Sequence, residues 1–411
     1  MTSSVSRPPS DLLADRYELY RELGEGTVAH TYLGLEHGPL GLRRLTTIKL
    51  LKPDIHHDAL RLEGLFAAAR RLAASDTPHL VEVRDMGAQG GEAFIAFPYL
   101  VGENLLSILA RCAQLGEPPP LAITRRIAAD AAAGLTSLHQ SPPETTGPPL
   151  HGALRPSNIL VAHTGLSHVL DAGIASNTQA LMARGSISPG IAQFTSPESL
   201  SERRLPDEEL DLTTDLYALA ACLYALVTLR FPFDEMQLEA LVVAKQHHAG
   251  VPASQRQRAV PSSLESFLTR TLSPSPGMRP QSAAELADEL RAVGANSTHA
   301  IADHATVARW LRKVFGEPFA NKMTFLRALI SPESHALPSA AQTQVQAPQA
   351  PTSSTKASRD GHESPRETSL EPFGEDESLG DFDEEDTEMI VSKDDTTALP
   401  PPDEQAPANP F

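Results

Sequence analysis

The sequence predicts an α+β protein with a strand-rich part, a helical part and a tail that does not fold. Short alternating or β-branched runs recur through the first hundred positions, which is typical of strands. After Gly102 the apolar residues recur at helical spacing, and from about Pro338 the chain turns to Ser, Pro, Gln, Ala and acidic residues. Such a tail buries too little apolar surface to offset its conformational entropy. We therefore expect a flexible lead-in over residues 1–15, a strand-rich lobe over 16–101, a helical lobe over 102–294, a helical appendage over 295–335 and a disordered acidic tail over 336–411.

The strand-rich lobe is expected to contain one helix. A strand over residues 17–23 leads into a glycine-containing turn and a second strand. Residues 58–74 have helix-forming composition and a partial apolar face. Further strands are predicted over residues 45–51, 80–83 and 94–100.

The helical lobe is predicted to be organised around one very apolar helix at residues 215–229, which should be central and buried. Other helices are expected over residues 104–113, 122–139, 264–272 and 282–293. In the appendage, an amphipathic helix over residues 306–315 should end at Gly316, because glycine is the favoured residue beyond a helix C-terminus. A second helix over residues 318–329 follows, and the pair either packs on the helical lobe or is offered to a partner.

Charge and composition exclude several classes of function. The net charge is −18, but residues 359–411 hold 17 acidic and 3 basic residues, which leaves only −4 for the first 358 positions. That near-neutral part has no basic stripe, so we expect no nucleic-acid partner. Residues 1–11 lack the features of a signal peptide, and the longest apolar run, residues 216–227, is about half of a membrane span. Cys112 and Cys222 should be buried thiols in a reducing compartment, and we expect a cytoplasmic protein without membrane contact.

Six motifs follow one another in a fixed order between Tyr17 and Val293. Gly24 and Gly26 follow the first strand, where amides without a neighbouring β-carbon can approach a phosphate. The others are Thr46-Thr47-Ile48-Lys49 in a strand, His151-Gly152-Ala153-Leu154-Arg155-Pro156-Ser157-Asn158, Asp171-Ala172-Gly173, Ser196-Pro197-Glu198 and Met278-Arg279-Pro280.

This series resembles the eukaryotic-like, or Hanks-type, Ser/Thr protein kinases of bacteria. The resemblance covers residues 17–293 and implies the bilobal protein-kinase fold. It implies that Gly24, Gly26, Lys49 and Asn158 bind ATP, and that Asn158 and Asp171 hold Mg²⁺. It also implies structural roles for four residues of the helical lobe: Glu198 should pair with Arg279, Asp215 should bind the backbone of the catalytic loop, and His151 belongs to that loop.

The sequence departs from the kinase pattern where the family acts on its substrate. Ala153 stands at the position of the catalytic Asp, and an ungapped alignment puts Ala68 at the position of the helix Glu that pairs with the strand Lys. Glu63 is the nearest alternative, but five residues are about 140° around a helix. Ile191 replaces the Thr that orients the catalytic Asp.

Several smaller departures accompany these. Ala29 stands at the third glycine position, Gly152 replaces an Arg, and Ala172 replaces a Phe. Thr31 and Thr47 present hydroxyls where the family packs apolar side chains on adenine, which weakens that packing.

These departures predict a pseudokinase, a kinase-fold regulator or scaffold that binds Mg-ATP weakly. A positioned general base contributes roughly 10²–10⁴-fold to a rate, so losing the base alone leaves room for slow phosphotransfer. The alternative is therefore a divergent Ser/Thr kinase of low activity. A third reading is a different ATP-dependent transferase on the same fold.

The acidic tail offers a second hypothesis. Thr387 lies among acidic residues with Ile390 three positions later, which resembles ligands of forkhead-associated, phosphothreonine-binding domains. Thr396 and Thr397 are further candidate phosphosites, and the alternative is a solubilising acidic tail. The expected partners are other signalling proteins, including an active kinase or a phosphothreonine-binding domain.

Overall fold

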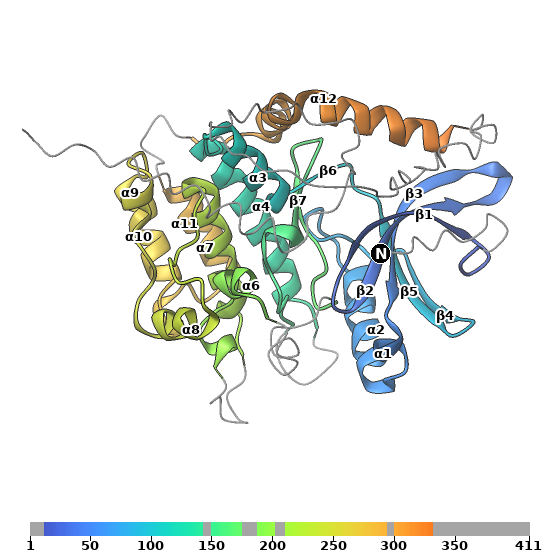
Figure 1. Cartoon of the computed structure of the whole chain (residues 1–411), viewed down its shortest axis with the longest axis horizontal. Coiled ribbons are helices and arrows are strands. Elements are labelled where there is room, and N and C mark those ends of the chain that lie inside the picture. Colours follow the sequence, from blue (N-terminus) through green and yellow to red (C-terminus); the bar gives the residue numbers. More distant parts are fainter. Residues whose placement is uncertain (1–11, 143–148, 175–186, 202–209, 294–299, 332–411) are drawn as a thin grey trace, which may run out of the picture.

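The structure is a computed structural model that describes residues 12–142, 149–174, 187–201, 210–293 and 300–331. It has the two lobes that the sequence predicts, a sheet lobe and a helical lobe lying side by side (Figure 1). The sheet lobe contains β1 (Tyr17–Glu25), β2 (Ala29–His37), η1 (Pro39–Gly41), β3 (Arg43–Leu51), α1 (Pro53–His56), α2 (Ala59–Ala73), β4 (Asp85–Gln89) and β5 (Glu92–Pro98).

The five strands form one antiparallel sheet in the order β1-β2-β3-β5-β4. Lys49 lies near the centre of this sheet, paired with Thr31 on β2 and with Ile95 on β5. Helix α2 begins after Asp58, whose carboxylate accepts bonds from two backbone amides of the first turn. Such a cap satisfies amides that have no partner within the helix.

Two expectations for this lobe were wrong in detail. Residues 80–83 form no strand: Leu80 makes only an isolated bridge to Val169, and the fourth strand is β4. Leu80, Val81 and Val83 are nevertheless buried, and an apolar run alone does not distinguish a strand from buried irregular chain. The lead-in is also shorter than predicted, because Leu13 is buried in a cluster with Tyr17.

The helical lobe is built around α7 (Thr213–Thr228), as predicted, and every residue of α7 is buried. A small sheet of β6, β7 and β8 lies at its junction with the sheet lobe (Figure 1). In chain order, the helical lobe contains β6 (Gly102–Asn104), α3 (Leu105–Leu115), α4 (Leu121–His139), η2 (Pro156–Asn158), β7 (Ile159–Ala162), β8 (Ser167–Val169), α6 (Pro189–Phe194), η3 (Glu198–Leu200), α7 (Thr213–Thr228), α8 (Leu238–His247), α9 (Ala253–Arg256), α10 (Ser262–Thr271), η4 (Pro276–Met278) and α11 (Ala283–Ala292).

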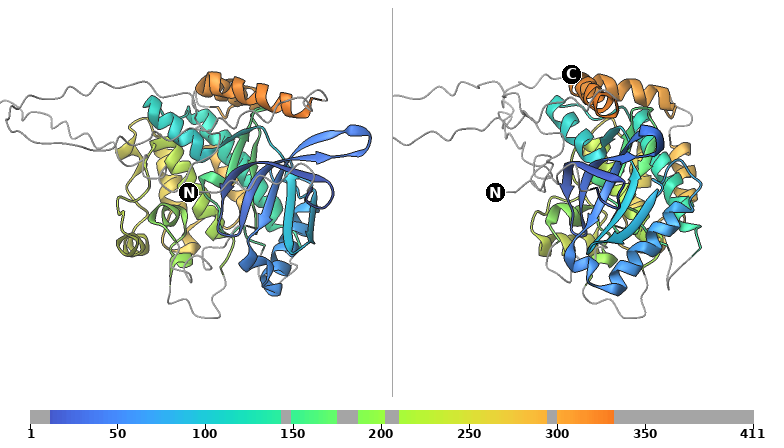
Figure 2. Two further views of the ribbon diagram at one scale, coloured as in Figure 1. Left: turned by 45° about the vertical axis from the view of Figure 1, so that its right-hand side comes forward. Right: turned by 90° about the vertical axis from the view of Figure 1, so that its right-hand side faces the viewer.

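The appendage is α12 (His304–Ile330), which consists of two helices joined at a kink. Gly316 has φ 50° and ψ −121°, so the first helix ends where the sequence predicts. Helix α12 packs on α3 and α4 of the helical lobe, which is one of the two predicted alternatives, and it also contacts β3 of the sheet lobe. Figure 2 shows it lying across the top of the molecule from the helical lobe to the sheet.

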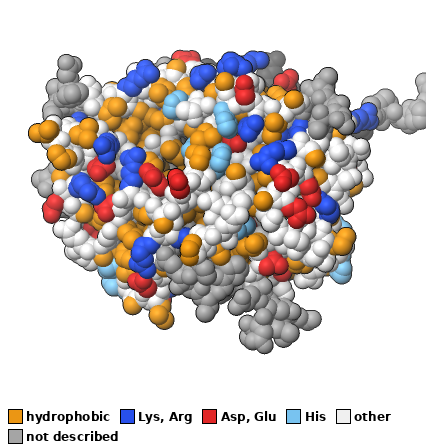
Figure 3. Space-filling model, turned by 180° about the vertical axis from the view of Figure 1, so that it is seen from behind, with side chains coloured by type: hydrophobic (Ala, Val, Ile, Leu, Met, Phe, Trp, Pro, Cys, Tyr) orange, Lys and Arg blue, Asp and Glu red, His pale blue; other side chains and the backbone are white. Residues whose placement is uncertain are grey.

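The surface and the thiols agree with the composition. Lys and Arg side chains alternate with Asp and Glu over the face drawn in Figure 3 and do not gather into one stripe. Cys112 and Cys222 are free and buried. Within the described ranges, no helix combines the length and the apolar character needed to cross a membrane. Residues 332–411, with the candidate phosphosites Thr387, Thr396 and Thr397, lie outside the described residues.

Candidate functional site

The loop that begins at His151 is held by one buried carboxylate of α7. The backbone amides of His151 and Gly152 donate to the two oxygens of Asp215, at 2.8 and 3.0 Å. His139, at the end of α4, contacts the same carboxylate at 2.9 Å. Burial alone would raise the pKa of Asp215, but these bonds and the neighbouring His139 and His151 lower it. The sequence pointed to Asp215, while His139 gave no signal because no motif spacing links it to the loop.

His151 connects this loop to the segment that precedes Asp171. Its Nδ1 accepts from the amide of Ala153 at 3.3 Å, so its Nε2 carries the proton and donates to the carbonyl of Leu170 at 2.9 Å. Burial lowers the pKa of His151 and keeps the ring neutral. Asn158 closes the loop, since its side-chain amide donates to the carbonyl of Ala153 at 2.9 Å.

Lys49 and Asp171 form an ion pair across the junction of the two lobes. Lys49 Nζ lies 3.0 Å from Asp171 Oδ2 and 3.4 Å from the hydroxyl of Thr31. Asp171 has φ 62°, in the left-handed region that non-glycine residues seldom adopt. Such backbone strain persists only where the surrounding structure imposes it.

Helix α2 supplies no carboxylate to this pair. Ala68 is buried and faces the Asp171 segment, because a β-carbon at Gly173 would lie 3.2 Å from that of Ala68. Glu63 points elsewhere: it is exposed and pairs with Arg70 at 2.7 Å. The helix position expected to carry a Glu therefore faces the site with a methyl group.

The residues present suit a Mg-nucleotide at its phosphate end better than at its base. One carboxylate and one amide oxygen, from Asp171 and Asn158, are a donor set that Mg²⁺ accepts when phosphate oxygens complete its shell. A β-carbon at Gly24, near the end of β1, would meet no other atom within 4 Å, so this end of the strand has open space beside it. At the base end, the hydroxyl of Thr31 accepts a bond from Lys49 at 3.4 Å.

A cavity of about 20 Å³ lies beside Ala153, and the lining side chains around it include Ile191, Thr195 and Ser196. Among the described residues that line it, one carries a carboxylate, Asp215. Its two oxygens already accept from two backbone amides and contact His139. Asp215 is therefore not available as a general base for a hydroxyl in this cavity.

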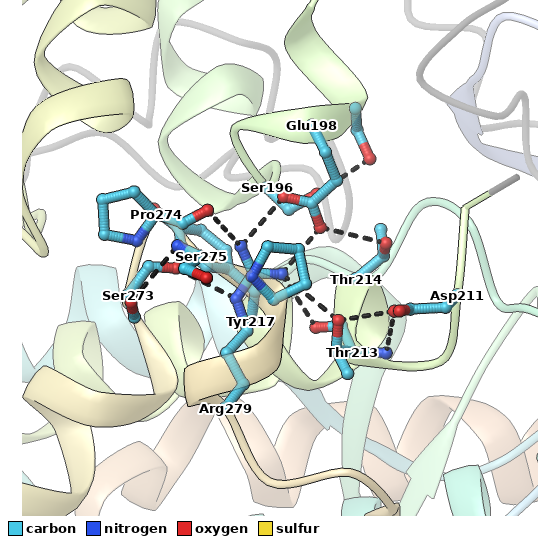
Figure 4. A network of polar contacts seen from close by, with 12 residues as sticks. Ser196, Glu198, Asp211, Thr213, Thr214, Tyr217, Ser273, Pro274, Ser275 and Arg279 are labelled. Atoms are coloured by element: carbon cyan, nitrogen blue, oxygen red, sulfur yellow. Dashed lines mark hydrogen bonds and ion pairs between the residues drawn. The ribbon is translucent and has the colours of Figure 1, made fainter. Parts of the chain in front are cut away.

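A buried ion pair anchors the segment that leads from this cavity to α7 (Figure 4). Arg279 binds Glu198 with both arms of its guanidinium, at 2.6 and 2.9 Å, as the sequence predicts. Its Nε donates to the carbonyl of Ser273, and the guanidinium lies 4.9 Å from the ring centre of Tyr217. Burial alone would raise the pKa of Glu198, but Arg279 lowers it.

Lys245 of α8 is a second anchor that the sequence gave no reason to suspect. It is fully buried, and its ammonium donates to the carbonyls of Gln193 and Thr195 and to the hydroxyl of Tyr217. Burial lowers its pKa well below the ordinary value. A single Lys near the end of a mostly apolar helix has no pattern that distinguishes it from an exposed one.

The buried groups predict that stability decreases in acid. His151, Asp215 and Glu198 all have a pKa below the ordinary value in the folded chain. The unfolded chain therefore binds more protons, and lowering the pH favours it. His151 contributes fully to the free energy of unfolding above its unfolded pKa of about 6.5, and the two carboxylates contribute fully above their unfolded pKa of about 4. Each contribution is lost as the pH falls from the unfolded pKa of the group to its folded pKa.

Urea midpoints measured between pH 7.5 and pH 4 test this dependence. We expect the midpoint to fall steadily, and His151→Gln, which cannot titrate, to flatten the slope between pH 7 and pH 5.5. A midpoint that rises on acidification in the unsubstituted chain would contradict the prediction.

Comparison with known proteins decides the family. The model of the family described as protein tyrosine and serine/threonine kinase matches residues 17–290, more than half of the chain. The chain belongs to the protein kinase family. It is 30% identical over 296 residues to the serine/threonine-protein kinase pkn2 of Myxococcus xanthus, covering 69% of this chain and 33% of that protein. It is 29% identical over 292 residues to the serine/threonine-protein kinase PknB of Mycobacterium leprae, covering 70% of this chain and 44% of that protein.

The tyrosine-protein kinase MasK of Myxococcus xanthus is 29% identical over 278 residues, with 67% of this chain and 42% of that protein covered. The chain thus spans less than half of the length of these curated kinases. Among solved structures, the kinase domain of Mycobacterium tuberculosis PknI has a TM-score of 0.50 and 23% sequence identity, covering 71% of this chain and 98% of that one. This likeness concerns the fold alone.

Proposed function

We propose that this kinase domain is a pseudokinase, a catalytically impaired signalling regulator or scaffold that binds Mg-nucleotide weakly and does not phosphorylate protein substrates. The observation that carries the proposal is the cavity beside Ala153. The one carboxylate that the described part of the chain brings to its lining is Asp215, which is committed to holding the catalytic loop. The methyl group of Ala68 at the Lys49–Asp171 pair supports the same proposal.

Weak nucleotide binding is the part of this proposal that the remaining residues support. When bound, Mg-ATP would supply the transferable phosphoryl group and the metal charge that offsets its oxygens. Lys49 would contact the phosphates, and Asp171 and Asn158 would hold the metal. The Lys49–Asp171 ion pair, at 3.0 Å, keeps the two side chains at the same end of the cleft.

A thermal shift with Mg-ATP tests this binding. At ten times the dissociation constant a ligand stabilises the folded chain by about 1.4 kcal/mol, which moves the melting temperature by a few degrees. We expect the shift in the unsubstituted chain and in Lys313→Met, whose Lys is exposed on α12. We expect its loss in Lys49→Met and Asp171→Asn. An unsubstituted chain without any shift would refute nucleotide binding.

The second candidate is a Ser/Thr kinase of low activity. The Lys49–Asp171 contact favours it, because a Lys and a metal-binding Asp at the phosphate end of the cleft are also what slow transfer requires. Phosphotransfer from Mg-ATP by the purified chain distinguishes the two candidates.

The expected partners remain signalling proteins, including an active kinase or a phosphothreonine-binding domain that reads the acidic tail. The two buried free thiols support a reducing compartment, the cytoplasm. Equal recovery of partners by chains with phosphorylated and unphosphorylated Thr387 would count against the tail as a phosphothreonine ligand.

A further inference from the structure

Helix α12 is attached to the helical lobe by its first half. Val307 and Leu311 are buried in the main core. Arg111 of α3 donates to the carbonyl of Val314 at 3.0 Å, and His304 contacts the buried Asp130 of α4 at 3.0 Å.

The start of α12 also sits on the turn between β7 and β8. A β-carbon at Gly165 would lie 1.9 Å from the carbonyl oxygen of His304, so only glycine permits this approach. The first half of α12 is therefore an integral part of the helical lobe.

The second half of α12 is attached to the sheet lobe. Leu326 and Leu329 are buried in one cluster with Leu33 and Leu35 of β2. The ring of Phe325 lies 5.9 Å from that of Tyr20 on β1. Gly316 breaks the helix between the halves, so the orientation of each half is set by its own contacts.

The same half also holds the segment that joins the lobes. Residues 99–101, the hinge segment, connect β5 to β6. Tyr99 and Val101 pack against the Leu326 cluster, and burial, the largest cause, raises the pKa of Tyr99 to about 12. Lys322 binds the carbonyl of Gly102 at 3.1 Å and the carboxylate of Glu103 at 2.7 Å. Both charged side chains of this pair are only 12% exposed, so water screens them little.

We propose that α12 is a strap that fixes the position of the two lobes relative to each other, with residues 317–330 as its releasable half. The hinge segment is one connection between the lobes and α12 is a second, on the same side of the molecule (Figures 1 and 2). The second half of α12 is attached both to β2 of the sheet lobe and to β6 at the start of the helical lobe, so a movement of β2 away from β6 requires one of these attachments to break. By restraining the lobes, the strap would also control the access of a nucleotide to the site between them. This second role rests on the proposed function, whereas the restraint on the lobes does not.

Spin-label distances across the cleft test the restraint directly. Labels on Leu60→Cys of α2 and Val243→Cys of α8 report the separation of the lobes, since both positions are exposed. The native thiols of Cys112 and Cys222 are buried, and burial raises the pKa of each, so they should resist labelling. We expect one narrow distance distribution in the otherwise unsubstituted chain.

The strap is released by Leu326→Asp with Leu329→Asp, which bury two charges in an apolar cluster. Ala328→Asp is the control, because it adds an Asp at an exposed position of the same turn. We expect a broad, longer distance distribution in the double variant and the narrow one in the control. An unchanged distribution in the double variant, with hydrogen exchange showing that residues 317–330 are released, would overturn the strap.

Lys322→Met is a milder variant that retains the apolar contacts. Losing a charge-assisted bond to Gly102 should make amide hydrogen exchange in residues 99–104 roughly tenfold faster without affecting α7. Exchange that stays unchanged in residues 99–104 would count against the strap.

Mg-ATP thermal shifts on the same variants separate the two proposals. If Mg-ATP shifts the melting temperature of no protein in the set, but the spin-label distances change in the double variant, the proposed nucleotide binding fails and the strap stands. If Mg-ATP raises the melting temperature of the unsubstituted chain and of the double variant equally, the strap does not control nucleotide access.

Discussion

Ala153→Asp is expected to raise phosphotransfer from Mg-ATP to a protein substrate roughly 10²-fold above the unsubstituted chain. A positioned general base contributes roughly 10²–10⁴-fold, and the remaining departures at Ala68 and Ile191 should hold the gain near the lower limit. The substitution puts a carboxylate at a cavity whose surrounding loop is already fixed by Asp215 and Asn158. Incorporation of labelled phosphate under matched conditions measures the ratio.

Ala153→Asn is the matched control, because it has the same size as Asp and accepts no proton at neutral pH. We expect it to match the unsubstituted chain, and we expect Asp171→Ala to abolish the gain of Ala153→Asp. If the unsubstituted chain already phosphorylates protein and loses that activity on Lys49→Met, the low-activity kinase replaces the pseudokinase as the conclusion.

Arg279→Met is expected to lower the free energy of unfolding by about 3–5 kcal/mol, the usual cost of removing one partner of a buried ion pair. The side chain of Arg279 is 0% exposed and that of Glu198 is 23% exposed, so the carboxylate left behind is mostly out of water. The carbonyl of Ser273 also loses its donor. Urea unfolding of the two proteins measures the difference.

The control is Arg291→Met, which removes the Arg of an exposed pair with Asp288 whose side chains are 55% and 77% exposed. Exposed pairs contribute less than about 1 kcal/mol, so this variant should resemble the unsubstituted chain. An Arg279→Met protein within 1 kcal/mol of the unsubstituted chain would show that the Glu198 pair does not anchor the lobe.

The elements that the sequence predicted best are those with a strong local pattern. The α7 helix and its burial follow from an uninterrupted apolar run that leaves no polar face for solvent. The end of the first helix of α12 follows from Gly316. The prediction of a strand over residues 80–83 was wrong for the converse reason. A four-residue apolar run indicates that the chain is buried but not which hydrogen bonds it makes.

For the candidate site, motif order gave the residue positions but not their partners. The pairing of Glu198 with Arg279 and the bonds of Asp215 to the loop were predicted, because the family pattern links those positions. The Lys49–Asp171 pair, the third contact of Asp215 with His139 and the buried Lys245 were not predicted. Each joins residues far apart in the chain through side-chain geometry, which no periodicity records.

The sequence by itself determined the two-lobe fold, its central helix and the absence of a carboxylate at position 153. These depend on residue identity at a position or on the 3.6-residue and two-residue periods of local structure. Only the tertiary structure decided that Asp215 is committed elsewhere and that α12 crosses from the helical lobe to the sheet. The apolar face of α12 shows that it packs on something, but the surface that it covers is set by where Leu33, Leu35 and Tyr99 come together after folding.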